Sequence, residues 1–301
     1  MSAEDQFLRA LTGDAEEQTV FVVRSYRSPI GEVWNAMTSP ERIARWYGTI
    51  VGPVPRVAGD TFQVDIGGGM VRRAVLEGCD APVGLAYTWW SGDDDPGLVR
   101  IRLESIGDET RVSVQHERLR PHRTTQYGAG WEQNLVALAG VVGAASASEV
   151  PSAARPERWE VLQAHPLHLE FEIDAPVAAV WDAWSSAPAL AAWWWNHWPD
   201  VTIAADVRPG GEYRFDAPEH GFTVSGEYIV VEPRHRLAFT WVWTDEDGAL
   251  RDEAVDVAFR ETANGTALVI RHTGPWAAAG PAESYRQGWE FVLAELTRQL
   301  G

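Results

Sequence analysis

Hydrophobic and polar residues follow two periods along the chain, and these periods occur in the same order in both halves. Each half opens with an apolar or alternating segment, at residues 20–26 and 168–173, which predicts a β-strand. A proline follows each strand, Pro29 in the first half and Pro176 in the second, at a position suited to the first turn of a helix. The pattern therefore predicts one strand and then two short helices in each half.

A longer region with period two comes next, interrupted by turn signals such as Gly67–Gly69 and Asn264–Gly265. It predicts a meander of about five or six antiparallel strands. Each half then returns to helical spacing, with apolar stripes formed by Tyr127, Trp131, Leu135 and Leu138, and by Tyr285, Trp289, Leu293 and Leu296. Because a sheet with one apolar face must be covered, we predict an α+β fold in which a curved sheet wraps around its long closing helix.

The two halves also share sequence landmarks, which indicates an internal duplication. Residues 85–89 read LAYTW and residues 237–241 read LAFTW, and each half later carries a strand ending in His and a Gly-Trp-Glu triplet. Two long copies are typical of two globular domains rather than of a solenoid. The sequence therefore predicts tandem domains at residues 19–142 and 167–301.

Two segments are expected to lie outside these domains. Residues 1–18 are acidic and polar, and we interpret them as a tail or a loosely docked helix. Residues 143–166 are rich in Ala, Ser and Pro, which is typical of a linker. Trp159 and Leu162, near the end of this linker, are expected to anchor it against the second domain.

The charge of the chain restricts its partners. It has 43 acidic residues against 25 basic ones, all of them arginine, and a net charge of −18. Such a field repels phosphate, so neither nucleic acid nor an anionic membrane is expected as a partner. No apolar run approaches the roughly 18 residues of a membrane span, and the N-terminus lacks a secretion signal. We expect a cytoplasmic protein, and the lysine-free composition suggests a bacterial one.

The sequence carries few signals of a cofactor or of a metal. Its single cysteine, Cys79, excludes an internal disulfide framework. The counterpart of Cys79 in the second half is Val231, so we interpret the thiol as a small hydrophobic group. Gly67–Gly69 is not followed by the Lys-Ser/Thr of a phosphate-binding loop, and no nucleophile elbow occurs. No cofactor and no metal are therefore expected.

The ordered landmarks resemble a known superfamily. They comprise Pro…Val-Trp on the first helix, a Trp closing the second, Leu-x-x-Thr-Trp in mid-sheet, a Gly…Thr…His strand and a late Gly-Trp, each found twice. This order is similar to that of the SRPBCC or START-like helix-grip superfamily, and within it to the C-terminal domain of the heat-shock-protein-90 ATPase activator family. The resemblance implies a deep cavity that binds lipids, hormones or aromatic compounds, catalyses ring chemistry, or contacts a chaperone. It brings no invariant catalytic set.

We therefore expect a small hydrophobic or aromatic ligand in a cavity between the sheet and the closing helix of each domain. Such pockets have volumes of about 300 Å³ or more, and flat aromatic side chains with one polar atom suit their walls. The second domain is the expected functional copy, because its Trp run and its cleaner alternation favour a better-defined pocket, whereas the first copy has Arg24 and Arg45 where the second has Phe171 and Trp193. The expected ligand-binding residues are Trp46, Trp89, His116, Tyr127 and Trp131 in the first domain, and Trp194, Trp241, His272, Tyr285 and Trp289 in the second.

An enzyme acting on a hydrophobic substrate is an alternative. His116 and His272 share the parity of apolar neighbours in their strands, so each imidazole is expected to face the cavity, where it could act as a general acid or base. A structural histidine, hydrogen-bonded to a neighbour, is the competing interpretation. Glu132 and Glu290 also match between the copies, but they lie beside the helix stripes and are weaker candidates.

A protein partner, such as a chaperone or a regulator, is the other alternative. The run Trp193–Trp198 contains four Trp in six residues, and these cannot all face one core from one helix end. One or two of them are expected at a pocket mouth or at an interface.

Overall fold

The computed structural model describes residues 7–92, 95–143 and 155–301. The chain divides into two compact units, formed by Met1–Arg9 with Ala15–Trp159 and by Ala10–Asp14 with Glu160–Gly301. Each unit contains one antiparallel sheet and one long closing helix. This confirms the predicted α+β fold with two helix-grip domains in tandem.

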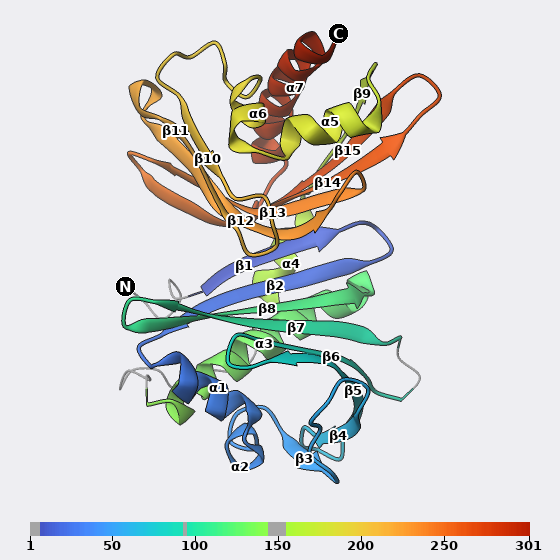
Figure 1. Cartoon of the computed structure of the whole chain (residues 1–301), viewed down its shortest axis with the longest axis vertical. Coiled ribbons are helices and arrows are strands. Elements are labelled where there is room, and N and C mark those ends of the chain that lie inside the picture. The colour runs from blue at the N-terminus through green and yellow to red at the C-terminus, as the bar shows by residue number, and fades with distance from the viewer. Residues whose placement is uncertain (1–6, 93–94, 144–154) are drawn as a thin grey trace. The chain divides into compact units, whose positions relative to one another are not determined.

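The first sheet has eight strands in the order β1-β2-β8-β7-β6-β5-β4-β3. Strand β2 pairs with β1 on one side and with the last strand β8 on the other, and β7 to β3 continue from β8 as a meander (Figure 1). The strands are β1 (Phe7–Gly13), β2 (Gln18–Tyr26), β3 (Thr49–Val51), β4 (Thr61–Asp65), β5 (Val71–Asp80), β6 (Gly84–Trp90), β7 (Gly97–Ile106) and β8 (Glu109–Leu119).

The second sheet repeats this arrangement with seven strands in the order β10-β11-β12-β13-β14-β15-β9. Its opening strand β9 again pairs with the last strand β15. The strands are β9 (Leu167–Ile173), β10 (Thr202–Ala205), β11 (Glu212–Ala217), β12 (Phe222–Glu232), β13 (Arg236–Asp245), β14 (Gly248–Glu261) and β15 (Thr266–Thr273), and η2 (Pro218–His220) is a short 3₁₀ turn.

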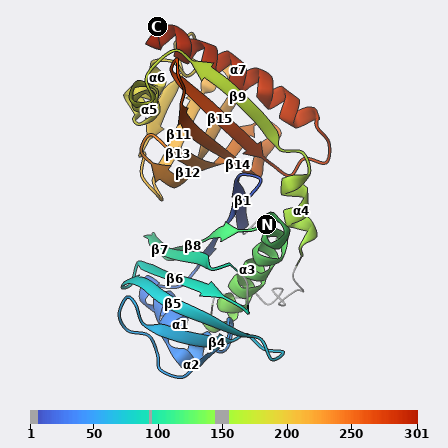
Figure 2. The ribbon, with the colours of Figure 1, turned by 90° about the vertical axis from the view of Figure 1, so that its right-hand side faces the viewer.

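The helices match between the units as well. The short pairs are α1 (Ile30–Thr38) with α2 (Pro40–Ile43), and α5 (Val177–Trp184) with α6 (Ala187–Ala191). The closing helices α3 (Pro121–Val141) and α7 (Gly280–Leu300) have 21 residues each and start with a proline in their first turn, where its missing N–H costs nothing. Helix α3 packs on β2 and β8, and α7 runs along β9 (Figure 2).

The prediction of a tail at residues 1–18 is wrong for the part that the structure describes. Phe7–Gly13 forms the strand β1, in which Phe7, Ala10 and Leu11 are buried. The sequence concealed this strand because Arg9 and Thr12 interrupt its apolar pattern, although both side chains are buried too. Residues 1–6 of that prediction lie outside the described residues.

The linker prediction at residues 143–166 also needs a correction. Its last part forms the helix α4 (Glu157–Ala164), and Trp159 in this helix is fully buried. Trp159 packs on Gly128 of α3, where a Cβ atom would come within 2.2 Å of the indole. It therefore anchors to the first unit and not, as expected, to the second domain. Residues 144–154 of this prediction lie outside the described part of the chain.

Candidate ligand-binding site

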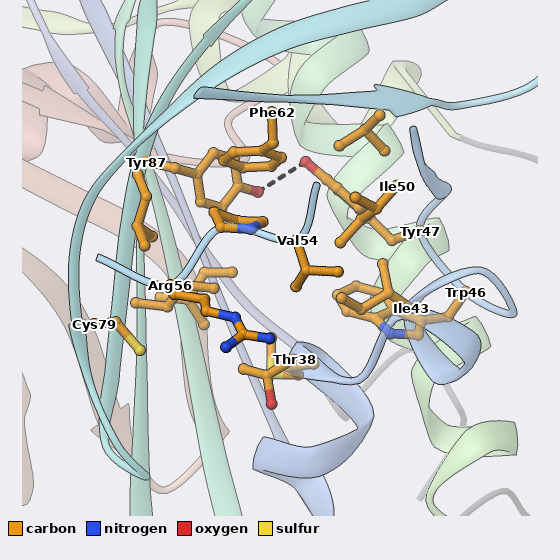
Figure 3. A pocket seen from close by; sticks show the side chains of 16 residues that line it. Thr38, Ile43, Trp46, Tyr47, Ile50, Val54, Arg56, Phe62, Cys79 and Tyr87 are labelled. Carbon is orange, nitrogen blue, oxygen red and sulfur yellow. Dashed lines mark hydrogen bonds between the residues drawn. The ribbon is translucent and has the colours of Figure 1, made fainter. Parts of the chain in front are cut away.

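An apolar cavity of about 140 Å³ lies in the first unit, beneath its short helices. Its 16 lining residues come from α1, α2, the segment 46–56 and the strands β3–β7 (Figure 3). Helix α3 contributes none of them, so this cavity lies elsewhere than we expected. It is also smaller than the expected volume, although an apolar cavity of about 150 Å³ can hold a benzene molecule.

The polar groups at this cavity are few. The hydroxyl groups of Tyr47 and Tyr87 form a hydrogen bond with each other at 2.7 Å. Burial raises the pKa of both phenols, so each is neutral and offers a ligand no charge. Arg56, Thr38 and Cys79 line another part of the cavity (Figure 3). The cavity is therefore an apolar chamber with a polar edge.

The segment after α2 places Tyr47 by two local constraints. The indole N–H of Trp46 donates to the carbonyl of Ala36 at 3.0 Å, which fixes the chain to α1. Gly48 follows, and a Cβ atom at that position would come within 2.8 Å of the carbonyl oxygen of Asp65. Because the backbone is held on both sides of it, the Tyr47 ring has a defined direction between the sheet and α3.

The same hydrogen bond in the second unit corrects the alignment of the two copies. The indole N–H of Trp193 donates to the carbonyl of Ala183 at 2.9 Å. Trp193 is therefore the structural equivalent of Trp46, and Trp194 corresponds to Tyr47. The sequence comparison had paired Trp46 with Trp194, one residue away, because either Trp can close a short helix.

Aromatic rings fill the space between the first sheet and α3. The ring of Tyr47 stacks on Trp89 of β6 and on Trp131 of α3, with centroid distances of 5.8 and 5.6 Å. Trp89 and Trp131 are buried, and Tyr47 is partly exposed. Among the expected residues, only Trp46 lines the apolar cavity. Trp89 and Trp131 form its neighbouring wall of packed rings.

His116 lies at the centre of these rings and is fully buried. The indole nitrogen of Trp89 is 3.0 Å from its Nε2, and that of Trp131 is 3.2 Å from its Nδ1. A neutral imidazole accepts at only one nitrogen, so only one of these indoles can donate to it at a time. Burial, with Arg72 nearby, lowers the pKa of His116 to about 3. The imidazole is therefore neutral at physiological pH, which favours a structural role over general acid catalysis.

The second unit repeats the ring cluster around His272. Trp194 packs against Trp241 and Trp289, at centroid distances of 6.3 and 5.3 Å. Burial lowers the pKa of His272 to about 3, and its Nδ1 lies 3.4 Å from the indole nitrogen of Trp289. The three cavities whose lining residues are described all lie in the first unit. The first unit, rather than the second, thus carries the candidate site.

A buried carboxylate distinguishes the second cluster from the first. The hydroxyl of Tyr285 donates to Glu253 at 2.7 Å, and the indole N–H of Trp276 donates to it at 2.8 Å. Burial raises the pKa of Glu253 to about 7. Its carboxylate oxygen is 3.8 Å from Nε2 of His272, but burial keeps that imidazole neutral, so the contact is not an ion pair at neutral pH. Neither Glu253 nor Trp276 was predicted from the sequence.

Glu132 has a structural partner that the sequence did not reveal. Both of its carboxylate oxygens accept from the guanidinium of Arg9 in β1, at 2.7 and 2.9 Å. The indole N–H of Trp159 donates to the same carboxylate at 2.7 Å. These contacts hold β1 and α4 against α3. Both carboxylate oxygens of Glu132 are engaged in them, which favours a structural role over a catalytic one. Glu290, its counterpart, is exposed on α7.

The expectation for the run Trp193–Trp198 is wrong in one respect. Trp193, Trp194 and Trp195 are all buried, and Trp198 is partly buried. Trp195 has a left-handed backbone conformation, with φ of 50°. This turn changes the direction of the chain, so consecutive indoles reach the same core. The run therefore does not form the exposed patch that a protein interface would need.

Arg56, Tyr47 and Arg72 are further residues that the sequence analysis missed. Arg72 lies on β5 with its guanidinium 3.8 Å from the ring centre of Trp89 and 5.2 Å from that of Tyr127. Its parity along the strand matches that of buried Ala74 and was the only available signal. Within the described ranges, no His, Cys, Asp and Glu side chains group as metal ligands would. No helix in that part of the chain is long and apolar enough to cross a membrane.

Comparison with known proteins identifies the family. The family model described as Activator of Hsp90 ATPase homolog 1-like protein matches residues 27–143 and 174–301. Comparison with curated proteins gives no match.

Several solved structures are similar. CalU16 from Micromonospora echinospora is 26% identical over 45% of this chain and 85% of its own, with a TM-score of 0.41. A protein from Rhizobium leguminosarum is 27% identical over 45% of this chain and 93% of its own, with a TM-score of 0.39. DynU16, a protein in the dynemicin biosynthetic locus, is 18% identical over 96% of this chain and all of its own, with a TM-score of 0.41.

Proposed function

The chain belongs to the family of Activator of Hsp90 ATPase homolog 1-like proteins, and we propose that its first unit binds a small neutral hydrophobic molecule in the apolar cavity. The cavity's lining carries the proposal. Its walls are formed by apolar side chains such as Ile43, Ile50 and Leu76, and the Tyr47–Tyr87 hydroxyl pair is already hydrogen-bonded. A ligand charge buried against these apolar walls would lose its hydration without gaining a partner there, and the one charged lining residue, Arg56, lies at the polar edge.

The volume limits the size of the ligand. About 140 Å³ accommodates one six-membered ring with a small substituent and excludes fused ring systems unless the walls move. A single aromatic ring would also contact the faces of Phe62 and Tyr87, whose centroids are 6.2 Å apart in an edge-to-face arrangement. We therefore expect toluene to bind more tightly than naphthalene.

Binding without catalysis is the function that these groups support best. An acid or base would have to titrate near neutral pH, whereas burial lowers the pKa of His116 to about 3. His116 also does not line the apolar cavity, because the rings of Tyr47 and Trp89 lie between. The imidazole contributes to the packing of the wall behind the site.

Cys79 provides a direct test, because it is the only cysteine and lines the cavity while being exposed. We expect saturating toluene to slow the reaction of Cys79 with a maleimide by severalfold in the full-length protein. Ile50→Phe, which fills part of the cavity, should abolish this protection. Ile203→Phe at the equivalent position of β10 is the matched control and should preserve it. An unchanged labelling rate with toluene in the wild-type protein would refute the proposal.

A further inference from the structure

A second cavity, of about 310 Å³, lies in the first unit between the ends of β7 and β8 and the first turn of α3. It shares no lining residue with the apolar cavity. Its lining contains Gly97, His116 and Tyr127, and it carries three arginines, Arg118, Arg120 and Arg123, against one carboxylate, Asp95. In a chain of net charge −18, this concentration of arginine calls for an explanation.

The second unit shows what occupies the corresponding place there. In the sheet registers, Gly97 is opposite Trp89, and Glu253 is opposite Trp241, so Gly97 and Glu253 are equivalent positions. The Glu253 carboxylate accepts a hydrogen bond from the hydroxyl of Tyr285, the counterpart of Tyr127. An indole therefore lies beside a carboxylate in the second unit, since Trp276 donates to Glu253 as well.

The aromatic part of this arrangement is also internal to the second unit. The Trp276 ring stacks on Tyr285 with a centroid distance of 5.5 Å and an interplanar angle of 29°. The segment that carries Trp276 follows β15, as the segment that begins with Arg120 follows β8 in the first unit. There it contains arginine instead of tryptophan, and Gly97 provides no carboxylate. The first unit keeps the histidine and the tyrosine but lacks the indole and the carboxylate that Trp276 and Glu253 provide in the second unit.

We propose that the basic cavity of the first unit binds a planar aromatic carboxylate, which supplies from outside the ring and the carboxylate that Trp276 and Glu253 supply in the second unit. Tyr127 is the expected hydroxyl donor, as Tyr285 is for Glu253. A Cβ atom at Gly97 would come within 2.5 Å of Nε2 of His116, so the imidazole occupies the space next to the glycine. The carboxylate therefore lies further out, toward Tyr127 and Arg118.

The charges around the cavity favour an anion. Arg118 has a left-handed conformation, with φ of 62°, and forms no ion pair with any of the described residues. Arg120 is paired with Asp95 at 2.9 Å, so it is partly neutralised. Arg72 adds a positive charge behind the Tyr127 ring, at 5.2 Å. A ligand carboxylate would gain charge-assisted hydrogen bonds here that a neutral ring would not.

The test measures the binding of indole-3-carboxylate to the full-length protein by calorimetry, with indole and inorganic phosphate as comparison ligands. We expect indole-3-carboxylate to bind more tightly than either. Tyr127→Phe removes one hydroxyl at a partly exposed position and should weaken binding by about tenfold or more, as expected for a hydrogen bond to a charged group. Arg118→Gln should weaken it as well and reduce its dependence on salt.

The duplication provides a matched control, because Tyr285→Phe makes the same change in the second unit and should leave the affinity unchanged. Equal affinities for indole and indole-3-carboxylate, or an unchanged affinity in Tyr127→Phe, would overturn the proposal. So would equally strong competition by phosphate, which would indicate a nonspecific basic surface. Indole-3-carboxylate should not protect Cys79 from the maleimide, which separates this site from the apolar cavity.

Discussion

Replacing Glu253 by Gln tests whether a buried carboxyl group makes the second unit less stable at alkaline pH. Glu253 is buried, and burial raises its pKa from 4.5 to about 7 despite the hydrogen bonds from Tyr285 and Trp276. His272 cannot compensate its charge, because burial keeps the imidazole neutral. Ionisation of Glu253 therefore costs free energy in the folded state.

The sign follows from proton counts. Between pH 4.5 and about 7, folded Glu253 keeps a proton that the unfolded chain has already released. The free energy of unfolding therefore falls as the pH rises through this range and levels off above it. A shift of this size corresponds to about 3 kcal/mol in total, of which about 2–3 kcal/mol is lost between pH 5 and pH 8.5.

The assay is urea unfolding of the wild type and of Glu253→Gln at pH 5 and pH 8.5. The neutral amide should remove this loss, so the variant should gain about 2–3 kcal/mol relative to the wild type on going to the higher pH. The Gln variant also loses about 1 kcal/mol of stability at every pH, because the amide NH2 that replaces one oxygen cannot accept a hydrogen bond. Glu290→Gln on the exposed face of α7 is the control and should show no such difference. A stability difference between Glu253→Gln and the wild type that is the same at both pH values would refute the reasoning.

Two further predictions concern the packing of α3 in the first unit. Gly128→Ala should destabilise this unit by about 2 kcal/mol or more in the same urea assay, because its Cβ would come within 2.2 Å of the buried Trp159 indole. Gly130→Ala is the control and should be neutral or slightly stabilising, because its Cβ would have no atom within 4 Å. Glu132→Ala should cost about 3–5 kcal/mol because it leaves the buried guanidinium of Arg9 without its carboxylate, and Arg9→Met in the same chain should recover part of the loss. If Arg9→Met restored none of the lost free energy of unfolding, Arg9 and Glu132 would not be energetically coupled.

The amino-acid sequence by itself determined the order of elements and the duplication. Period two and period 3.6 are local properties, so the strands other than β1 and the closing helices could be predicted from the spacing of apolar residues alone. The same spacing placed His116 and His272 next to the tyrosines and tryptophans of α3 and α7. These residues lie together because strand parity and helix stripes both point toward the shared core.

Only the tertiary structure decided where the cavities lie and which charged groups form ion pairs. Arg9 and Glu132 are 123 positions apart, and no local pattern reports that they pair. Trp195 has a left-handed backbone conformation that changes the direction of the chain. The structural equivalence of Trp46 and Trp193 follows from the hydrogen bond that each indole donates to a backbone carbonyl. A cavity is the volume that side chains from several elements fail to fill, so it depends on their relative positions and not on any one segment of sequence.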